Sequence, residues 1–185
     1  MEGASAELKK VSRMDVVYEY SKWQCAPECQ GSWFECATQV LDQNGVEPVE
    51  FASSVRELLT NARGKNRNLF ITGPTNCGKT FLLKPLQTMF NTFSNPANDK
   101  YAFVGIADAD IMFLNDFQWD REMIPWRDLL LLEGQPVHFP MPKNHYKDDI
   151  YLTRDTPIFA TGKAVTTFKG PYNARDPTED EMMVS

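Results

Sequence analysis

The stretch 68-NLFITGPTNCGKTFLL-83 decides the fold of this chain. It opens with an apolar run, residues 68–72, of the kind that forms a buried strand, and it closes with apolar residues at helical spacing. The eight residues between them fit the pattern G-x-x-x-x-G-K-[ST] at every fixed position: Gly73, Pro74, Thr75, Asn76, Cys77, Gly78, Lys79 and Thr80. A preceding strand and a following helix are the context in which this pattern forms a phosphate-binding loop.

The residue types in this loop suit ATP and Mg²⁺. Its glycines allow a tight turn that points successive backbone N–H groups at phosphate oxygens, and the helix that starts near Gly78 adds its positive end. We expect Lys79 to reach the β- and γ-phosphates and to act in catalysis, and Thr80 to offer its hydroxyl to the metal. A chance match in a Gly-rich turn is the alternative, and the strand–loop–helix context disfavours it.

The composition excludes several classes of protein. The chain has 185 residues, about one domain, with 42% apolar residues and a formal net charge of −6. This apolar content excludes wholesale disorder. No stretch is apolar over the length of a membrane span, and the first 30 residues contain no apolar secretory segment, so we expect no membrane partner. The acidic balance argues against coating nucleic acid through bulk charge, though not against a local basic groove.

Helical and strand patterns alternate from Pro48 onward. A helix is predicted to begin at Pro48, because apolar residues follow it at positions 51, 55, 58 and 59, and residues 111–114 and 157–161 are further strand candidates. The alternation predicts an α/β fold, a P-loop NTPase with a mostly parallel sheet covered on both faces, over residues 46–185. Residues 1–45 form an accessory segment of unknown role.

Weaker patterns occur in the remaining segments. We expect a helix within residues 8–23, loop and turn over residues 23–36, a helix within residues 121–133 and an extended hairpin over residues 137–151.

A second strand supplies the carboxylate that a phosphate loop requires. The apolar run 111–114 is followed directly by Asn115 and Asp116. Asp116 is our first choice for the catalytic carboxylate that also holds the metal, and Asn115 is the weaker neighbour, suited to a metal-bound water. The alternative is a strand that simply ends in a polar turn.

The four cysteines do not predict a metal site. Cys25, Cys29 and Cys36 lie close together, but zinc prefers four ligands in two close pairs, and both histidines lie more than 100 residues further along the chain. Cys77 lies inside the phosphate loop, where a disulfide would obstruct the site. We therefore expect free thiols in a reducing, intracellular compartment.

Four segments together resemble the superfamily 3 helicases, the replication ATPases of parvoviruses, papillomaviruses, polyomaviruses and related mobile elements. The segments are GPTNCGKT, IMFLNDFQW, LLEGQPVHFPMPKNH and PIFATG, and the resemblance covers residues 48–170. It implies an AAA+-type core that assembles as a homo-oligomeric ring, usually a hexamer, around single-stranded DNA, with ATP between subunits. It also implies a location in the host nucleus.

The resemblance assigns roles to particular residues. The family's second motif falls on Asn115 and Asp116, and its DNA-contacting hairpin falls on residues 136–151, with Lys143 and His145 at the contacting positions. The local charge agrees, because residues 143–175 contain six Lys or Arg against three Asp. A solubilising charge is the alternative for Lys143, and packing is the alternative for His145.

Three departures from the family pattern keep a second function open. Asn115 replaces an acidic residue, and Gly162 occupies the place of an asparagine that senses the γ-phosphate, for which Thr161 or Lys163 could substitute. The chain also stops where the family's arginine finger should begin, so we expect a fragment truncated at its C-terminus. The favoured function is an ATP-dependent DNA helicase. The alternatives are a catalytically weakened ATP-binding module that oligomerises or holds DNA, and, ranked last, a small-molecule kinase.

Overall fold

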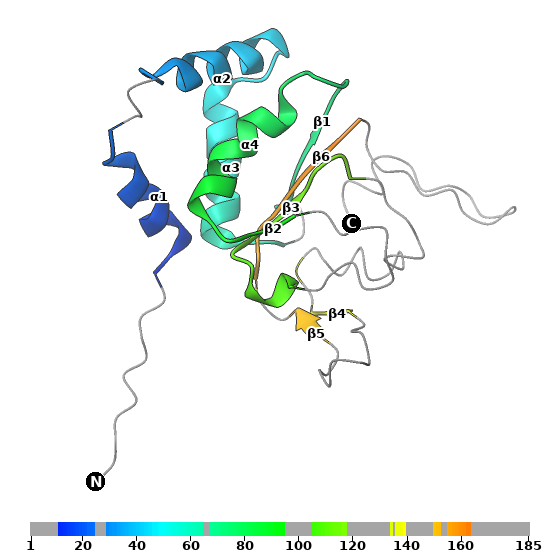
Figure 1. Ribbon diagram of the computed structural model, residues 1–185. Helices are drawn as coiled ribbons and strands as arrows, with labels where there is room; N and C mark the ends of the chain where they lie inside the picture. The colour runs from blue at the N-terminus through cyan, green and yellow to red at the C-terminus, as the bar shows by residue number, and fades with distance from the viewer. Residues whose placement is uncertain are drawn as a thin grey trace, which may run out of the picture.

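A computed structural model describes residues 11–24, 29–64, 67–94, 105–117, 134, 136–139, 150–152 and 155–163. In chain order the elements of this part of the chain are α1 (Arg13–Ser21), α2 (Ser32–Gln43), α3 (Pro48–Asn61), β1 (Leu69–Thr72), α4 (Lys79–Met89), β2 (Thr92–Ser94), the 3-10 turn η1 (Ile106–Asp108), β3 (Ile111–Leu114), β4 (Val137–Phe139), β5 (Ile150–Leu152) and β6 (Ile158–Gly162). Among these described elements, helices and strands alternate from α3 to β3, with two further helices before them and three strands after them (Figure 1).

The main sheet has four parallel strands in the order β1-β6-β3-β2, which confirms the predicted α/β fold with a parallel sheet. Thr72 pairs with Gly162 and Leu114 pairs with Ala160, so β1, β6 and β3 end at the same edge of the sheet. β6 therefore lies between β1 and β3. The loop after β1 and the turn after β3 leave the sheet about 10 Å apart, which is two strand spacings.

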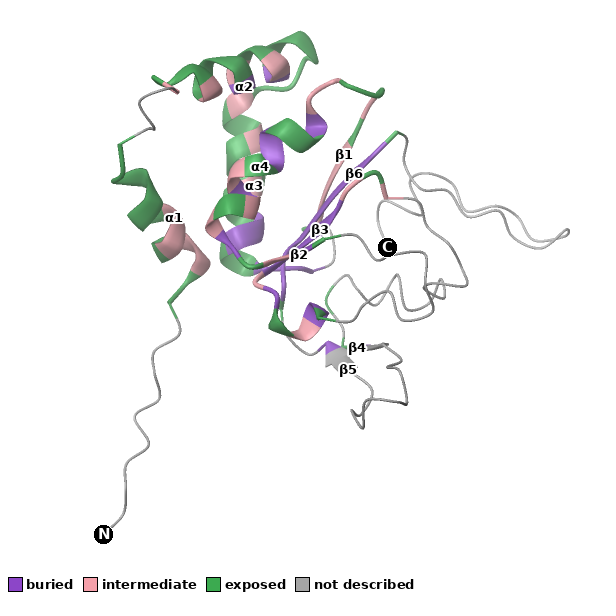
Figure 2. Ribbon diagram, viewed as in Figure 1, coloured by how far each residue is buried: buried purple, intermediate pink, exposed green. Residues whose placement is uncertain are grey.

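One face of the sheet packs against helices α3 and α4. Ile111 and Phe113 of β3 and Phe159 of β6 are buried there with Leu58 of α3 and Leu83 of α4. Figures 1 and 2 show α3 and α4 lying on this side of the sheet. The alternate residues of the same strands point the other way, as the two-residue period of a strand requires. Packing against α3 and α4 thus fixes one face of the strands that precede the loop after β1 and the turn after β3.

The other face is covered by η1 and by the hairpin β4–β5. This second cluster of buried side chains contains Met112, Leu114, Ile158 and Ala160 from the sheet, and Ile106, Val137 and Leu152 from the elements that cover it. The predicted burial of both faces is confirmed. β4 and β5 pair antiparallel, with Val137 opposite Leu152, which confirms the two ends of the predicted hairpin.

A buried arginine joins the hairpin to the end of α3. Arg63 is only 4% exposed, and its guanidinium donates a 3.1 Å hydrogen bond to the carbonyl of Leu152 in β5. Burial lowers the pKa of the Arg63 guanidinium below its ordinary value, and the nearby charge of Asp155 opposes this shift.

The predicted helix from Pro48 is confirmed, but two other expectations need correction and one strand was missed. Residues 23–36 were expected to form loop and turn, yet α2 begins at Ser32, because Ala37 and Leu41 give it an apolar face that packs near Leu82 of α4. The three-residue strand β2 had no predictable pattern. β1 is half-buried rather than buried, because it lies at the edge of the described sheet.

Several expectations fall outside the described residues, among them the helix in 121–133, the hairpin tip with Lys143 and His145, and Cys25. None of the described helices is both long enough and apolar enough to span a membrane.

Candidate functional site

The loop from Gly73 to Thr80 connects β1 to α4, in the context that its sequence requires. Gly78 caps α4 in the left-handed conformation, with φ of 91°, and the helix begins at the next residue, Lys79. Asn76 also has a positive φ, of 65°, so the chain reverses within a few residues. This backbone brings the first turn of α4 and its unpaired N–H groups to the carboxyl-terminal edge of the sheet, where an anion is favoured.

The side chain of Lys79 folds back into the loop. It is buried, and its Nζ donates hydrogen bonds to the carbonyl oxygens of Gly73, at 2.8 Å, and Pro74, at 2.7 Å. The Sγ of Cys77, a free thiol, lies 3.6 Å from the same nitrogen. The loop therefore encloses a positive charge that a phosphate group could contact by exchanging places with these carbonyls.

Thr80 and Asn115 join the loop to the end of β3. The Thr80 hydroxyl donates a 2.7 Å hydrogen bond to Asn115 Oδ1, and the Thr161 hydroxyl donates to the same oxygen at 3.0 Å. Thr161 Oγ1 in turn accepts a 2.9 Å hydrogen bond from the backbone N–H of Asp116. Thr161 is completely buried in β6, so this network fixes the turn after β3 against its neighbouring strand.

Asp116 lies in the same pocket as the phosphate loop. Its backbone is left-handed, with φ of 48°, a conformation that Asp adopts more readily than most residues. The pocket has a volume of about 330 Å³, and Asp116 lines it together with residues of the loop. The loop and the first turn of α4 contribute every residue from Thr75 to Phe81 to the lining.

The predicted phosphate-loop and acidic-turn residues thus lie near one another, whereas Lys143 and His145 lie outside the described residues. All eight residues of the phosphate loop, together with Asn115 and Asp116, lie at one edge of the sheet.

Two residues of β6 complete the site, and the sequence predicted only part of their roles. Thr161 was considered as a substitute for a phosphate sensor, whereas the structure shows that its hydroxyl holds Asn115 and Asp116. Gly162 lies against the loop, since its carbonyl accepts a 3.1 Å hydrogen bond from the N–H of Gly73. Lys163, the other substitute considered, is exposed just beyond β6. The sequence could not reveal these roles because no local pattern shows the strand order, in which β6 lies between β1 and β3.

Comparison with known proteins gives a likeness of fold. No protein-family model and no curated protein matches the chain. Among solved structures, the A form apo structure of the NrS-1 C-terminal region aligns with a TM-score of 0.51 and 11% sequence identity, over 76% of this chain and 34% of that one. The chain thus spans about a third of that solved chain, and identity this low shows a shared fold alone.

Proposed function

We propose that this chain is the ATPase domain of a DNA-replication helicase. The observation that carries the proposal is the 2.7 Å hydrogen bond between Thr80 of the loop and Asn115 at the end of β3, with Asp116 lining the same pocket. A chance match to the loop pattern has no reason to be joined to a second strand that ends in a carboxylate. Phosphoryl transfer requires that juxtaposition.

The loop accounts for binding of the ATP phosphates. Its backbone N–H groups and the first turn of α4 offer donors and a positive helix end. The Lys79 ammonium, now held by two backbone carbonyls, exchanges them for oxygens of the β- and γ-phosphates. The buried ammonium lies inside the loop that would surround the phosphates, where it would stabilise the negative charge that develops in the reaction.

Mg²⁺ fits the oxygen atoms at the end of β3. The hydroxyl of Thr80 and the amide oxygen of Asn115 already lie within hydrogen-bonding distance, and the Asp116 carboxylate lines the same pocket. Hydroxyl, amide and carboxylate oxygens are the ligand types that this hard cation prefers. Thr80 and Asp116 would hold the ion, with Asn115 beside a metal-bound water. When bound, the ion neutralises phosphate charge.

Hydrolysis follows from the same residues. Asp116 orients and polarises a water molecule, whose oxygen attacks the γ-phosphorus while the bond to the β–γ bridging oxygen breaks. The products are ADP and inorganic phosphate. Lys79 stabilises the charge that accumulates on the phosphate oxygens in the transition state.

The DNA-related part of the proposal rests on the family resemblance. Lys143 and His145 lie between β4 and β5 in sequence and would contact the phosphates of single-stranded DNA. ATP hydrolysis would move this hairpin within a homo-oligomeric ring, in the nucleus of a host cell.

ATP turnover with and without single-stranded DNA tests the proposal. We expect DNA-stimulated hydrolysis on the order of 1 s⁻¹, lost in Lys79→Ala and in Asp116→Ala. Lys84→Ala is the matched control, because Lys84 is an exposed lysine of the same helix. Hydrolysis that survives in Lys79→Ala would overturn the proposal.

A weakened ATP-binding module that oligomerises or holds DNA is the second candidate. Two observations favour it: Asn115 replaces a carboxylate, and Gly162 presents only backbone to Gly73, with no side chain to sense a phosphate. Lys79-dependent ATP binding without turnover, at saturating Mg²⁺ and DNA, would identify this function.

A further inference from the structure

Helix α2 packs directly on the phosphate loop. A Cβ atom placed on Gly78 would lie 2.7 Å from Cγ1 and 3.3 Å from Cγ2 of Val40, which is closer than side chains tolerate. Val40 therefore occupies the space that the missing side chain of Gly78 leaves. This contact brings α2 to the wall of the phosphate pocket, although the whole of α3 separates α2 from β1 in the sequence.

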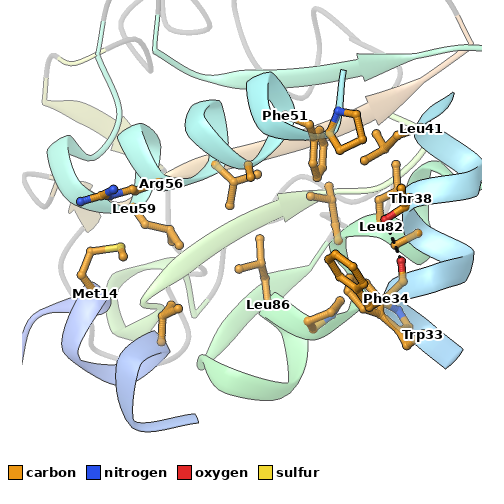
Figure 3. A pocket seen from close by; sticks show the side chains of 17 residues that line it. Met14, Trp33, Phe34, Thr38, Leu41, Phe51, Arg56, Leu59, Leu82 and Leu86 are labelled. Atoms are coloured by element: carbon orange, nitrogen blue, oxygen red, sulfur yellow. Dashed lines mark hydrogen bonds between the residues drawn. The ribbon is translucent and has the colours of Figure 1, made fainter. Parts of the chain in front are cut away.

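An aromatic pair extends this contact along α4. The rings of Trp33 in α2 and Phe81 in α4 lie 5.6 Å apart between centroids and are tilted by 38°. Phe81 lines the phosphate pocket and is 37% exposed, and Trp33 is half-buried. Figure 3 shows Trp33 and Phe34 projecting from α2 at one end of an apolar groove, next to Leu82 of α4.

The residues that line the pocket indicate which end of a bound nucleotide would meet Trp33 and Phe81. Asp116 and Asn115 mark the end where the γ-phosphate reacts. Phe81 follows Lys79 and Thr80 in the first turn of α4 and lines the same pocket. A nucleotide whose phosphates follow the loop carries its base on the side away from the carboxylate. Aromatic side chains bind a base by stacking on its π face.

We propose that Trp33 and Phe81 form the base-binding wall of the nucleotide site, so that α2 recognises the ring of a purine nucleoside triphosphate. The inference rests on the proposed ATP binding at the phosphate loop. Stacking accepts any base with a large π face, so GTP binds nearly as well as ATP, while the smaller rings of CTP and UTP bind more weakly.

Two ligands separate base recognition from phosphate recognition. Inorganic tripolyphosphate carries the phosphates of ATP without the base. We expect Trp33→Ala to weaken ATP binding about tenfold and to leave tripolyphosphate binding unchanged, and Trp33→Phe to retain most of the ATP affinity. Trp23→Ala is the matched control, because Trp23 is an exposed aromatic residue that stacks on Tyr20 at the end of α1.

The same titrations distinguish failure of this inference from failure of the proposed function. If Trp33→Ala weakens both ligands equally, or neither, Trp33 only packs α2 against α4 and the inference is wrong. If Lys79→Ala changes the binding of neither ligand, the phosphate loop is not the site and the proposed function fails.

Fluorescence gives a second readout that does not depend on a destabilised variant. With the other three tryptophans replaced by phenylalanine, the emission comes from Trp33 alone. ATP should quench this emission and tripolyphosphate should leave it unchanged. Equal responses to both ligands would contradict stacking of the base on Trp33.

Discussion

The amide oxygen of Asn115 accepts hydrogen bonds from two threonine hydroxyls, that of Thr80 at 2.7 Å and that of Thr161 at 3.0 Å. The two donors belong to different elements, the start of α4 and the buried strand β6. One uncharged side chain therefore links the phosphate loop, the turn after β3 and the strand between them.

Asn115→Asp should strengthen the response to Mg²⁺. A carboxylate can accept both threonine hydrogen bonds, so we expect stability to change by only about 0.5 kcal/mol. The added charge should lower the Mg²⁺ concentration needed for half-maximal ATP hydrolysis about tenfold. Asn61→Asp, an exposed change at the end of α3, is the control. An unchanged Mg²⁺ titration would show that residue 115 does not face the metal.

Thr161→Val should loosen the turn that carries Asp116. The substitution keeps the shape of the side chain but removes the acceptor for the Asp116 N–H and a donor to Asn115. We expect a loss of about 1–3 kcal/mol in the free energy of unfolding, and a larger fall in kcat than in ATP affinity. Thr161→Ser retains the hydroxyl and should restore both, as denaturant unfolding and steady-state kinetics would show. A Thr161→Val protein of full stability would contradict this role.

Gly78→Ala and Val40→Ala test the packing of α2 on the loop as a double-mutant cycle. Gly78→Ala introduces a Cβ against Val40 and also forces alanine into φ of 91°. Val40→Ala should relieve the contact but leave the backbone cost of about 1–2 kcal/mol. A coupling energy near zero in the unfolding free energies would mean that Val40 does not contact the loop in solution.

Arg63→Met should destabilise the fold without affecting ATP binding. It removes the hydrogen bond to the Leu152 carbonyl, and we expect a cost of about 1–3 kcal/mol. Because burial lowers the pKa of Arg63, the unfolded chain holds this proton more tightly, so stability rises with pH only in the strongly alkaline range between the lowered pKa and the ordinary arginine pKa. The difference in the free energy of unfolding between the unchanged protein and Arg63→Met, measured by denaturant unfolding, should therefore be the same at pH 6 and pH 8. A destabilisation by Arg63→Met that changes between pH 6 and pH 8 would show that a group other than Arg63 titrates and contributes to it.

Local patterns were sufficient to predict that the phosphate-loop residues and the turn at Asn115 and Asp116 follow two strands of the sheet. The loop around Lys79 was predictable because its glycines, lysine and threonine stand at fixed spacing between a strand and a helix. The turn at Asn115 and Asp116 was predictable because a polar pair follows four apolar residues, all of which are buried.

Contacts between distant segments could not be predicted in this way. Thr161 acquires its role only because β6 inserts between β1 and β3, and no local pattern encodes that order. Val40 and Trp33 were missed because α2 has no N-terminal capping side chain and begins after a left-handed glycine, Gly31, which reads as a turn.

The position of β6 has a mechanical consequence. Its carboxyl end holds the hydroxyl that fixes the turn at Asp116, and its amino end begins at Ile158, shortly after β5 ends at Leu152. An extended strand barely stretches, at about 3.3 Å per residue. One rigid strand therefore connects the hydroxyl that fixes the turn at Asp116 to the segment that leads from the hairpin β4–β5.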